Sequence, residues 1–380
     1  MKIALLGLGT VGKAVYDIII KKQAAIFKKE NITISRILVR NKAKYFYVPS
    51  HLLTTDYTDI INDDSIDVVI EMMGADVSYE YMKLALEKKK HVITANKEVI
   101  ANHYEQLQKI AIANGVKLLF EASVGGGIPI VHTMLNSGPF NEINSIKGIL
   151  NGTTNFILTS MQKEHLTFDE ALKLAQEKGF AEADPTADLE GLDMVRKIAI
   201  LSMISYNSLI DINKIYHYGI SKVTREIVEI ADLLGYHIKF IASSYKNGKD
   251  VSITVEPVFL KTSELLATVD YEYNIVEYNG DNCGTQVMYG KGAGYVTANS
   301  IIFDLGLIIN NFIQSFVPEE KLNIIGNSGI KARYFIQPKG QIDGYYVEKN
   351  FKKFIISKEL KAMELESLLT SVQFYARIID

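Results

Sequence analysis

The first 125 residues alternate short apolar segments with longer amphipathic ones. The apolar segments have the length of buried strands, and the segments between them follow a helical period. This pattern predicts strands near residues 2–6, 32–40, 66–74, 91–95 and 116–120. Helices are expected from the turn after the first strand to about Lys29, over 78–90 and over 98–114. This alternation predicts an α/β fold with a doubly wound parallel sheet of Rossmann type.

The pattern changes after SVGGGIP, residues 123–129. A strand over 143–150 precedes a helical region that extends to about residue 236, and strands then prevail to residue 290. A glycine-rich turn at 290–294 leads into a long apolar helix. We expect a discontinuous Rossmann domain (residues 1–125 plus 293–325), a second, α+β domain (126–292) and a short C-terminal extension (326–380).

The turn after the first strand reads GLGTVG and matches G-x-G-x-x-G. Gly7 permits the tight turn, Gly9 lets a pyrophosphate approach the backbone, and Gly12 allows close packing of helix on strand. Thr10 and Val11 begin the helix, whose N-terminal N–H groups attract phosphate. Because the motif lies between a predicted strand and a predicted helix, it favours dinucleotide binding over a βα turn without a ligand.

The end of the second strand carries the signal that separates NAD from NADP. It reads VRNK and contains no acid that could bind a ribose 2′-hydroxyl. Arg40 could instead accept the 2′-phosphate of NADP, which favours NADP(H) over NAD(H). The alternative is that Arg40 is an ordinary solvated cation.

The segment DLEGLDMVRKIAIL, residues 188–201, is expected to be one helix that places charges among apolar positions. Asp193 and Lys197 are four residues apart and share a face, and Glu190 is expected on the same side. Arg196 points away and can extend to solvent. A lysine placed in this way could exchange a proton with a substrate, but a surface ion pair explains the spacing equally well.

Two further stretches carry candidate chemistry. Lys97 follows the strand HVIT, and ligands of open parallel sheets bind at the carboxyl ends of strands. Glu121 is expected to end a strand just before three glycines, where one carboxylate and several carbonyls could hold a cation. A solvated lysine and a plain turn are the alternatives.

Composition excludes several classes of protein. The net charge of −3 predicts no general attraction to nucleic acid or to an acidic membrane surface. The chain has one cysteine, Cys283, so it has no internal disulfide and suits a reducing, cytoplasmic setting. No apolar run is long enough to span a bilayer, and no zinc-binding histidine spacing occurs.

Several motifs together closely resemble homoserine dehydrogenase. They follow that family's order from residue 3 to about 312: GLGTVG, TANKEVIA, EASVGGGIPI, GILNGTTNFIL, GFAEADPTADLEGLDMVRKIAIL and GKGAG. The resemblance implies NAD(P)-dependent interconversion of L-aspartate 4-semialdehyde and L-homoserine, on the threonine and methionine branch of the aspartate pathway. It also implies a small-molecule substrate bound by the second domain, and a homodimer, which the strand-rich region 236–290 independently suggests.

The resemblance implies roles for individual residues. Lys197 is similar to the family's acid/base lysine, and Lys97 to the lysine beside the nicotinamide, which is implicated in cofactor binding and proton transfer. Glu182 and Asp193 match residues that hold the substrate. Cofactor contacts match Thr10, Val11, Arg40 and Gly292, and a monovalent cation site, for sodium or potassium, matches Glu121, Val124, Gly126 and Ile128.

Two other functions are compatible with parts of this pattern. A non-catalytic NADP-binding sensor would share the glycine turn, but it would not need Lys97, Lys197, Glu182 and Asp193. A semialdehyde dehydrogenase acting through a thioester would need Cys283 as its nucleophile. The 326–380 segment could be a truncated remnant of the ACT domain that many relatives carry, which makes control by threonine doubtful.

Overall fold

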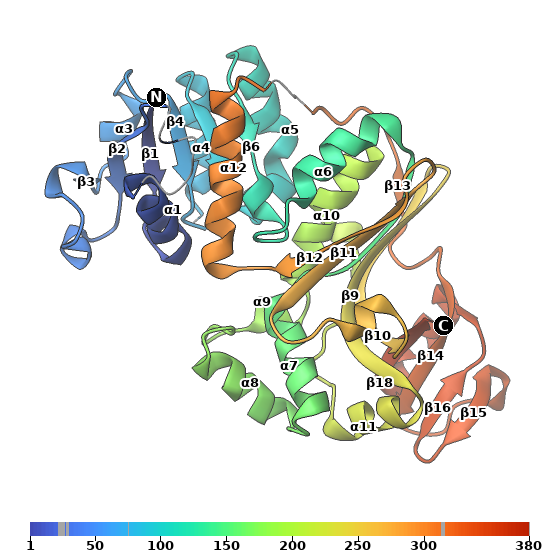
Figure 1. Ribbon diagram of the computed structural model, residues 1–380. Coiled ribbons are helices and arrows are strands. Elements are labelled where there is room, and N and C mark those ends of the chain that lie inside the picture. The colour runs from blue at the N-terminus through green and yellow to red at the C-terminus, as the bar shows by residue number, and fades with distance from the viewer. Residues whose placement is uncertain (22–26, 28–29, 75, 313–315, 380) are drawn as a thin grey trace. The chain divides into compact units, whose positions relative to one another are not determined.

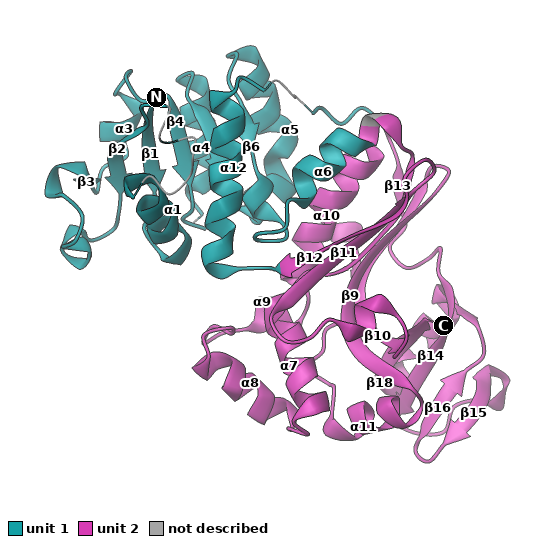
Figure 2. Ribbon diagram, viewed as in Figure 1, with its two compact units in different colours: residues 1–137, 291–319 teal, residues 138–290, 320–380 magenta. Residues whose placement is uncertain are grey.

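The computed structural model describes residues 1–21, 27, 30–74, 76–312 and 316–379. They form two compact units (Figures 1 and 2). Unit 1 contains residues 1–137 and 291–319, and unit 2 contains residues 138–290 and 320–380. By this division residues 126–137 belong to the first unit, and the C-terminal segment belongs to the second.

Unit 1 is built on a parallel sheet that, in the described residues, has six strands in the order β3-β2-β1-β4-β5-β6. This is the strand order of a Rossmann fold, so the predicted fold class is confirmed. The strands are β1 (Lys2–Leu6), β2 (Thr33–Leu38), β3 (Leu53–Thr54), β4 (Val68–Glu71), β5 (His91–Thr94) and β6 (Leu118–Leu119).

Helices cover both faces of this sheet. Unit 1 contains the helices α1 (Thr10–Ile20), α3 (Thr58–Ile61), α4 (Ser78–Glu87), α5 (Lys97–Ala113), α6 (Ile130–Ser137) and α12 (Thr297–Ile309). Ile3 and Leu5 share a core with Val15 of α1 and Ile301 of α12. Leu6 points to the opposite face and is also fully buried. Helix α1 ends at Ile20, and residues 22–26 and 28–29 of its predicted continuation to Lys29 lie outside the described residues.

Unit 2 contains one large mixed sheet, of twelve strands within the described residues. Its strands follow the order β12-β11-β7-β9-β10-β18-β14-β16-β15. Outside this order, β8 and β13 pair with β10, and β17 pairs with β14. Helices α7, α10 and α11 pack against the long strand β9 (Figure 1). The strands are β7 (Ile143–Ile149), β8 (Tyr216–His217), β9 (Tyr236–Asn247), β10 (Asp250–Lys261), β11 (Tyr273–Gly280), β12 (Gly284–Lys291) and β13 (Asn323–Ile324). The helices are α7 (Gly152–Lys163), α8 (Phe168–Glu177), α9 (Thr186–Leu189), α10 (Leu192–Tyr206) and α11 (Arg225–Leu233).

The C-terminal segment completes the sheet of unit 2. It comprises β14 (Lys331–Pro338), β15 (Val347–Phe351), β16 (Phe354–Ser357), β17 (Leu360–Lys361), α13 (Ala362–Leu368) and β18 (Val372–Ile379). Strand β18 pairs in parallel with β10 and antiparallel with β14. Phe335 and Phe374 are fully buried, so this segment contributes to the core of the unit.

The structure corrects two local predictions. The helix expected over 188–201 is interrupted, because Gly191 has a φ of +87° and separates α9 from α10. The expectation that Glu190 and Asp193 share one helical stripe is therefore wrong. Glu121 does not end a strand: β6 stops at Leu119, and Glu121 begins the 3-10 helix η3 (Glu121–Ser123).

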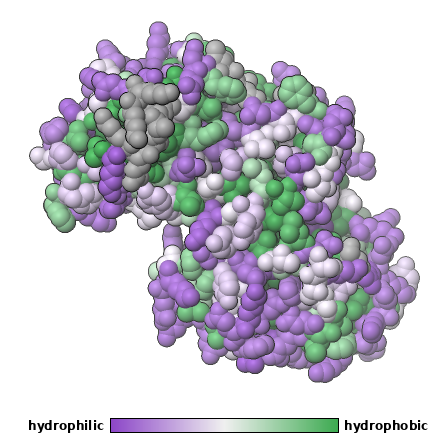
Figure 3. All heavy atoms as spheres, viewed as in Figure 1, coloured by the Kyte–Doolittle hydropathy of each residue, from purple (hydrophilic) through white to green (hydrophobic). Residues whose placement is uncertain are grey.

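No helix in the described part of the chain is both long enough and apolar enough to cross a membrane. Hydrophilic side chains cover most of the face shown in Figure 3, and apolar side chains gather over the long strands of unit 2.

Candidate functional site

The glycine turn of unit 1 has the backbone geometry that phosphate binding requires. Gly7 has a φ of +93°, and a Cβ atom at Gly12 would lie 2.4 Å from the Gly7 carbonyl oxygen. Gly9 faces open space and is the N-cap of α1, without a side chain that could cap the helix. The first-turn N–H groups at Thr10 and Val11 therefore lie where an anion can bind.

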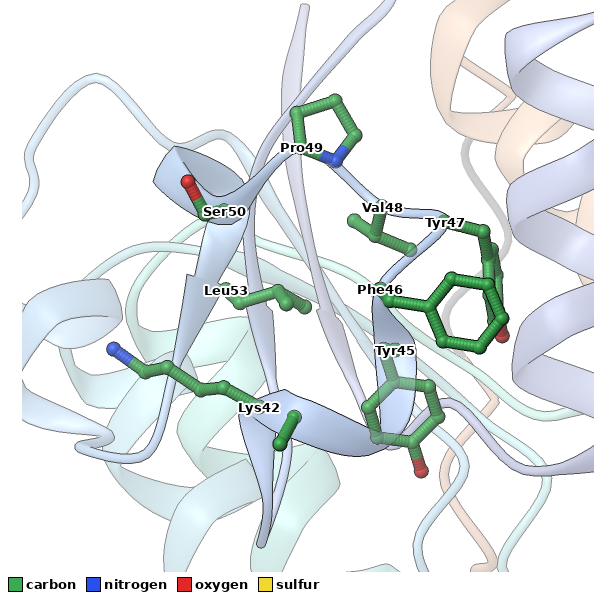
Figure 4. A pocket seen from close by; sticks show the side chains of 9 residues that line it. Lys42, Tyr45, Phe46, Tyr47, Val48, Pro49, Ser50 and Leu53 are labelled. Carbon is green, nitrogen blue, oxygen red and sulfur yellow. The ribbon is translucent and has the colours of Figure 1, made fainter.

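A pocket follows the second strand of unit 1. It has a volume of about 520 Å³ and is lined by residues 42, 43, 45–50 and 53. Figure 4 shows Lys42 and Phe46 on opposite sides of this pocket, with Val48 and Leu53 between them. Arg40 is exposed two residues before the pocket begins. The pocket therefore joins cationic and aromatic side chains at the edge where a Rossmann fold binds adenosine.

Lys97 is the first residue of α5 and is half-buried. The strand ends around it are tied together by Glu71, which is fully buried. The carboxylate of Glu71 accepts hydrogen bonds from the backbone N–H of Met73 at 2.8 Å and from the hydroxyl of Thr94 at 2.7 Å. The Thr94 hydroxyl in turn accepts from the N–H of Asn96 at 2.9 Å. One buried acid thus fixes the carboxyl ends of β4 and β5 just before Lys97.

Lys197 and Asp193 form the predicted i,i+4 pair inside unit 2. Their Nζ and Oδ2 atoms are 2.7 Å apart, and their side chains are only 12% and 9% exposed. Lys197 also donates to the backbone carbonyl of Leu150 at 2.7 Å. Asn151 donates from Nδ2 to Asp193 Oδ2 at 2.9 Å and to Asp188 Oδ1 at 2.7 Å. This geometry belongs to a largely buried polar network rather than to a surface ion pair.

Glu182 is exposed in the loop that precedes α9. Its backbone carbonyl accepts a hydrogen bond from Gln176 at 3.1 Å. Cys283 lies in the turn between β11 and β12, and its thiol contacts the carbonyl of Gly284 at 3.4 Å. The substrate-binding role of Glu182 stays a prediction.

Glu121 belongs to a buried polar cluster in unit 1. Its carboxylate accepts from the N–H groups of Val131 and His132, at 3.0 and 2.8 Å, at the start of α6. Its own N–H donates to Asp304 at 3.0 Å, and His132 Nε2 lies 2.7 Å from Asp304. Burial, with a contribution from the Asp304 charge, raises the pKa of Glu121 to about 7.

The loop after Glu121 contacts a second predicted cofactor residue. A Cβ atom at Gly126 would lie 2.3 Å from the backbone of Gly292, so these two glycines are in close contact. The Gly126 carbonyl accepts a hydrogen bond from Ser300 at 2.6 Å. The backbone carbonyls of Val124 and Ile128 lie on the same short loop.

Sequence reasoning missed several residues of these sites. Glu71 could have been noticed as an acid inside an apolar strand, and Asn151 belongs to a stretch rich in hydrogen-bonding side chains. The hydrogen bond between His132 and Asp304 connects residues that are 172 positions apart in the sequence. No local pattern reports a contact of that kind.

Comparison with known proteins agrees with this arrangement. Residues 7–121 match the family profile "Homoserine dehydrogenase, NAD binding domain", and residues 129–305 match "Homoserine dehydrogenase". The homoserine dehydrogenase of Bacillus subtilis is 39% identical over 351 residues, which is 91% of this chain and 79% of that protein. The chain belongs to the homoserine dehydrogenase family. It is therefore an NAD(P)-dependent oxidoreductase that acts on a CH–OH group, and the sensor function is not favoured.

Solved homoserine dehydrogenases have the same fold. The structure from Thiobacillus denitrificans superposes with a TM-score of 0.92 at 30% identity, covering 100% of this chain and 98% of that one. The Staphylococcus aureus enzyme at pH 7.5 superposes with a TM-score of 0.79 at 37% identity, covering 100% of this chain and 98% of that one. A hyperthermophilic archaeal homoserine dehydrogenase in complex with NADPH superposes with a TM-score of 0.72 at 25% identity, covering 83% of this chain and 99% of that one.

Proposed function

We propose that Lys197 is the acid/base residue of homoserine dehydrogenase chemistry in this chain. Its ammonium group protonates the carbonyl oxygen of aspartate semialdehyde as that oxygen becomes an alkoxide, and accepts the proton in the reverse direction. When bound, the reduced nicotinamide supplies the hydride. The observation that carries this proposal is the largely buried Lys197–Asp193 pair, held at 2.7 Å inside a polar network.

Three other residues have proposed roles in the reaction. Asp193 fixes the Lys197 ammonium group and, with Glu182, binds the polar groups of the substrate. Lys97 binds the cofactor and assists proton transfer from its position at the start of α5. The role of Lys97 in cofactor binding is supported by its place just after the carboxyl end of β5, where parallel sheets bind ligands.

NADP(H) is the proposed cofactor, in preference to NAD(H). Gly7, Gly9 and Gly12 shape the turn for the pyrophosphate, and Gly292 contributes a further backbone contact. Arg40 binds the 2′-phosphate as a charge-assisted donor. The pocket beside it suits the adenine ring, since Phe46 is 91% exposed and available for stacking.

A monovalent cation is proposed at the loop that follows η3. The carbonyls of Val124, Gly126 and Ile128 are hard oxygen donors, and Glu121 supplies negative charge. The residues fit such an ion: burial is the main cause of the raised pKa of Glu121, so a cation bound beside it would stabilise its charged form. We expect sodium or potassium chloride to raise the melting temperature more than choline chloride at equal ionic strength. Equal effects of the three salts would contradict the cation site.

We further propose a homodimer that forms through unit 2, in the cytoplasm, where a single cysteine stays reduced. Strand β12 is at the edge of the sheet, and most of its residues are exposed, including Val287 at 39% and Tyr289 at 57%. Exposed edge strands readily pair with another chain. Light scattering should give twice the chain mass for the wild type, and Tyr289→Lys should weaken the dimer.

The proposed reaction can be tested by following NADPH absorbance at 340 nm with aspartate semialdehyde as substrate. We expect faster turnover with NADPH than with NADH, and Asp193→Asn should slow it by about tenfold or more because Lys197 is then misplaced. Glu277→Gln is the matched control, since Glu277 pairs with Lys147 at 3.1 Å elsewhere in unit 2. Wild-type turnover in Asp193→Asn would contradict the assignment.

A further inference from the structure

Asn151 is the residue at which the polar network of unit 2 converges. The residue is 4% exposed, and its side chain makes hydrogen bonds through both ends of its amide. The Oδ1 atom accepts from the N–H of Thr154 at 2.9 Å, which caps helix α7. The Nδ2 atom donates to Asp188 at 2.7 Å and to Asp193 at 2.9 Å.

Capping alone does not explain why this position is an asparagine. Asparagine, aspartate and serine cap helices about equally well, because each supplies an oxygen to the first-turn N–H groups. Only asparagine adds two N–H donors to that oxygen. Both donors of Asn151 are used, one on each of two carboxylates. These two carboxylates lie on either side of Gly191, where the helix is interrupted.

The network also explains how Lys197 is held. Asp193 Oδ2 receives Lys197 Nζ at 2.7 Å and Asn151 Nδ2 at 2.9 Å. The carbonyl of Leu150, the neighbour of Asn151, accepts the second hydrogen bond of Lys197 at 2.7 Å. Residues 150 and 151 therefore hold both the ammonium group and its carboxylate. Because the amide of Asn151 is neutral, it orients Asp193 without competing for the lysine charge.

We propose that Asn151 is a positioning residue for the reaction. Its amide sets the orientation of Asp188 and Asp193, and through Asp193 it sets the position of the Lys197 ammonium group. This inference rests on the proposed role of Lys197 as the acid/base residue.

Two substitutions separate positioning from capping. Asn151→Ser and Asn151→Asp both retain a capping oxygen, and both remove the two amide donors. We expect kcat to fall roughly tenfold to a hundredfold in each, as for a small misplacement of a reacting group. Asn151→Asp should be the slower variant, since it sets a third carboxylate against Asp188 and Asp193. The Kd for NADPH, measured by fluorescence titration, should stay at the wild-type value. Asn151→Ser should remain folded with a lower melting temperature, because Asp188 and Asp193 each lose a hydrogen bond.

Thr224→Asp is the control, because Thr224 caps α11 in the same unit and is exposed. It exchanges a cap and adds a carboxylate, and we expect it to keep wild-type turnover. Wild-type kcat in both Asn151→Ser and Asn151→Asp would overturn the proposal and leave Asn151 as a helix cap. Lys197→Ala, assayed in parallel, distinguishes the two hypotheses. If Lys197→Ala is inactive and the Asn151 variants are active, only the positioning role fails; if Lys197→Ala is active, the acid/base assignment itself fails.

Discussion

At the scale of single residues, the proposed chemistry depends on one ammonium group and its immediate partners. Lys197 lies among apolar neighbours of α10, and an unpaired charge there would be costly. The carboxylate of Asp193 and the carbonyl of Leu150 compensate for that burial. The same contacts orient the ammonium group, so one arrangement serves both stability and the proposed proton transfer.

Arg40 carries the proposed cofactor preference, and Arg40→Ala tests it. Loss of a hydrogen-bonded charge should raise the KM for NADPH by about tenfold to a hundredfold, equivalent to about 1.5–3 kcal/mol. The KM for NADH should change little, because NADH has no 2′-phosphate. Arg225→Ala, an exposed arginine of unit 2, is the control. Equal losses with both cofactors would refute the 2′-phosphate contact.

At the scale of elements, the break between α9 and α10 decides which side chains meet. A continuous helix would have placed Glu190 beside Asp193, whereas Gly191 allows Asp188 and Asp193 to bind one asparagine. The i,i+4 spacing of Asp193 and Lys197 was predictable because it depends on one helix. The break was not, because the glycine acts through its contacts with β9 and β10.

Gly191→Ala should destabilise unit 2. The alanine would adopt a φ of +87°, and its Cβ would lie 2.9 Å from Phe240 and from Val255. Backbone strain and overpacking together should lower the free energy of unfolding by about 2–4 kcal/mol, measured with denaturant. Gly179→Ala is the control, since Gly179 also has a positive φ but faces open space. If both variants lose the same stability, the packing argument is wrong.

Lys239 in β9 predicts a pH dependence of stability. It is fully buried, and that burial lowers its pKa to about 8, although Asp270 opposes the shift. The folded chain therefore releases this proton at a lower pH than the unfolded chain, whose value is 10.5. The contribution of Lys239 to the free energy of unfolding should therefore rise as the pH increases from about 8 to 10.5. The difference in melting temperature between wild type and Lys239→Met should thus shift in favour of wild type from neutral pH to about pH 10; a constant difference would contradict it.

At the scale of the whole molecule, the sequence predicted the Rossmann sheet well and the C-terminal segment poorly. Parallel strands buried on both faces appear as apolar runs, so β1, β4 and β5 were readable from local pattern. The place of β18 beside β10 depends on a pairing between residues 258–260 and 377–379. Pairings at that separation leave no periodic signal, which is why this segment was expected to be a separate extension.

A buried ion pair should reveal how strongly the C-terminal segment holds unit 2 together. Arg377 of β18 lies 3.0 Å from Glu256 of β10, and both side chains are nearly inaccessible. Arg377→Met should cost about 3–5 kcal/mol, because it leaves a buried carboxylate unpaired. Adding Glu256→Leu should restore most of that stability in a denaturant titration. If Arg377→Met alone is as stable as wild type, the C-terminal segment contributes little to the stability of unit 2.

The most direct measurement is the turnover of Lys197→Ala with aspartate semialdehyde and NADPH, beside NADPH binding to the same protein. We predict a loss of about two to four orders of magnitude in kcat, as for removal of a general acid, with the Kd for NADPH nearly unchanged. Lys147→Ala, which removes an ion-paired lysine elsewhere in unit 2, should retain its activity. Wild-type turnover in Lys197→Ala would contradict the account.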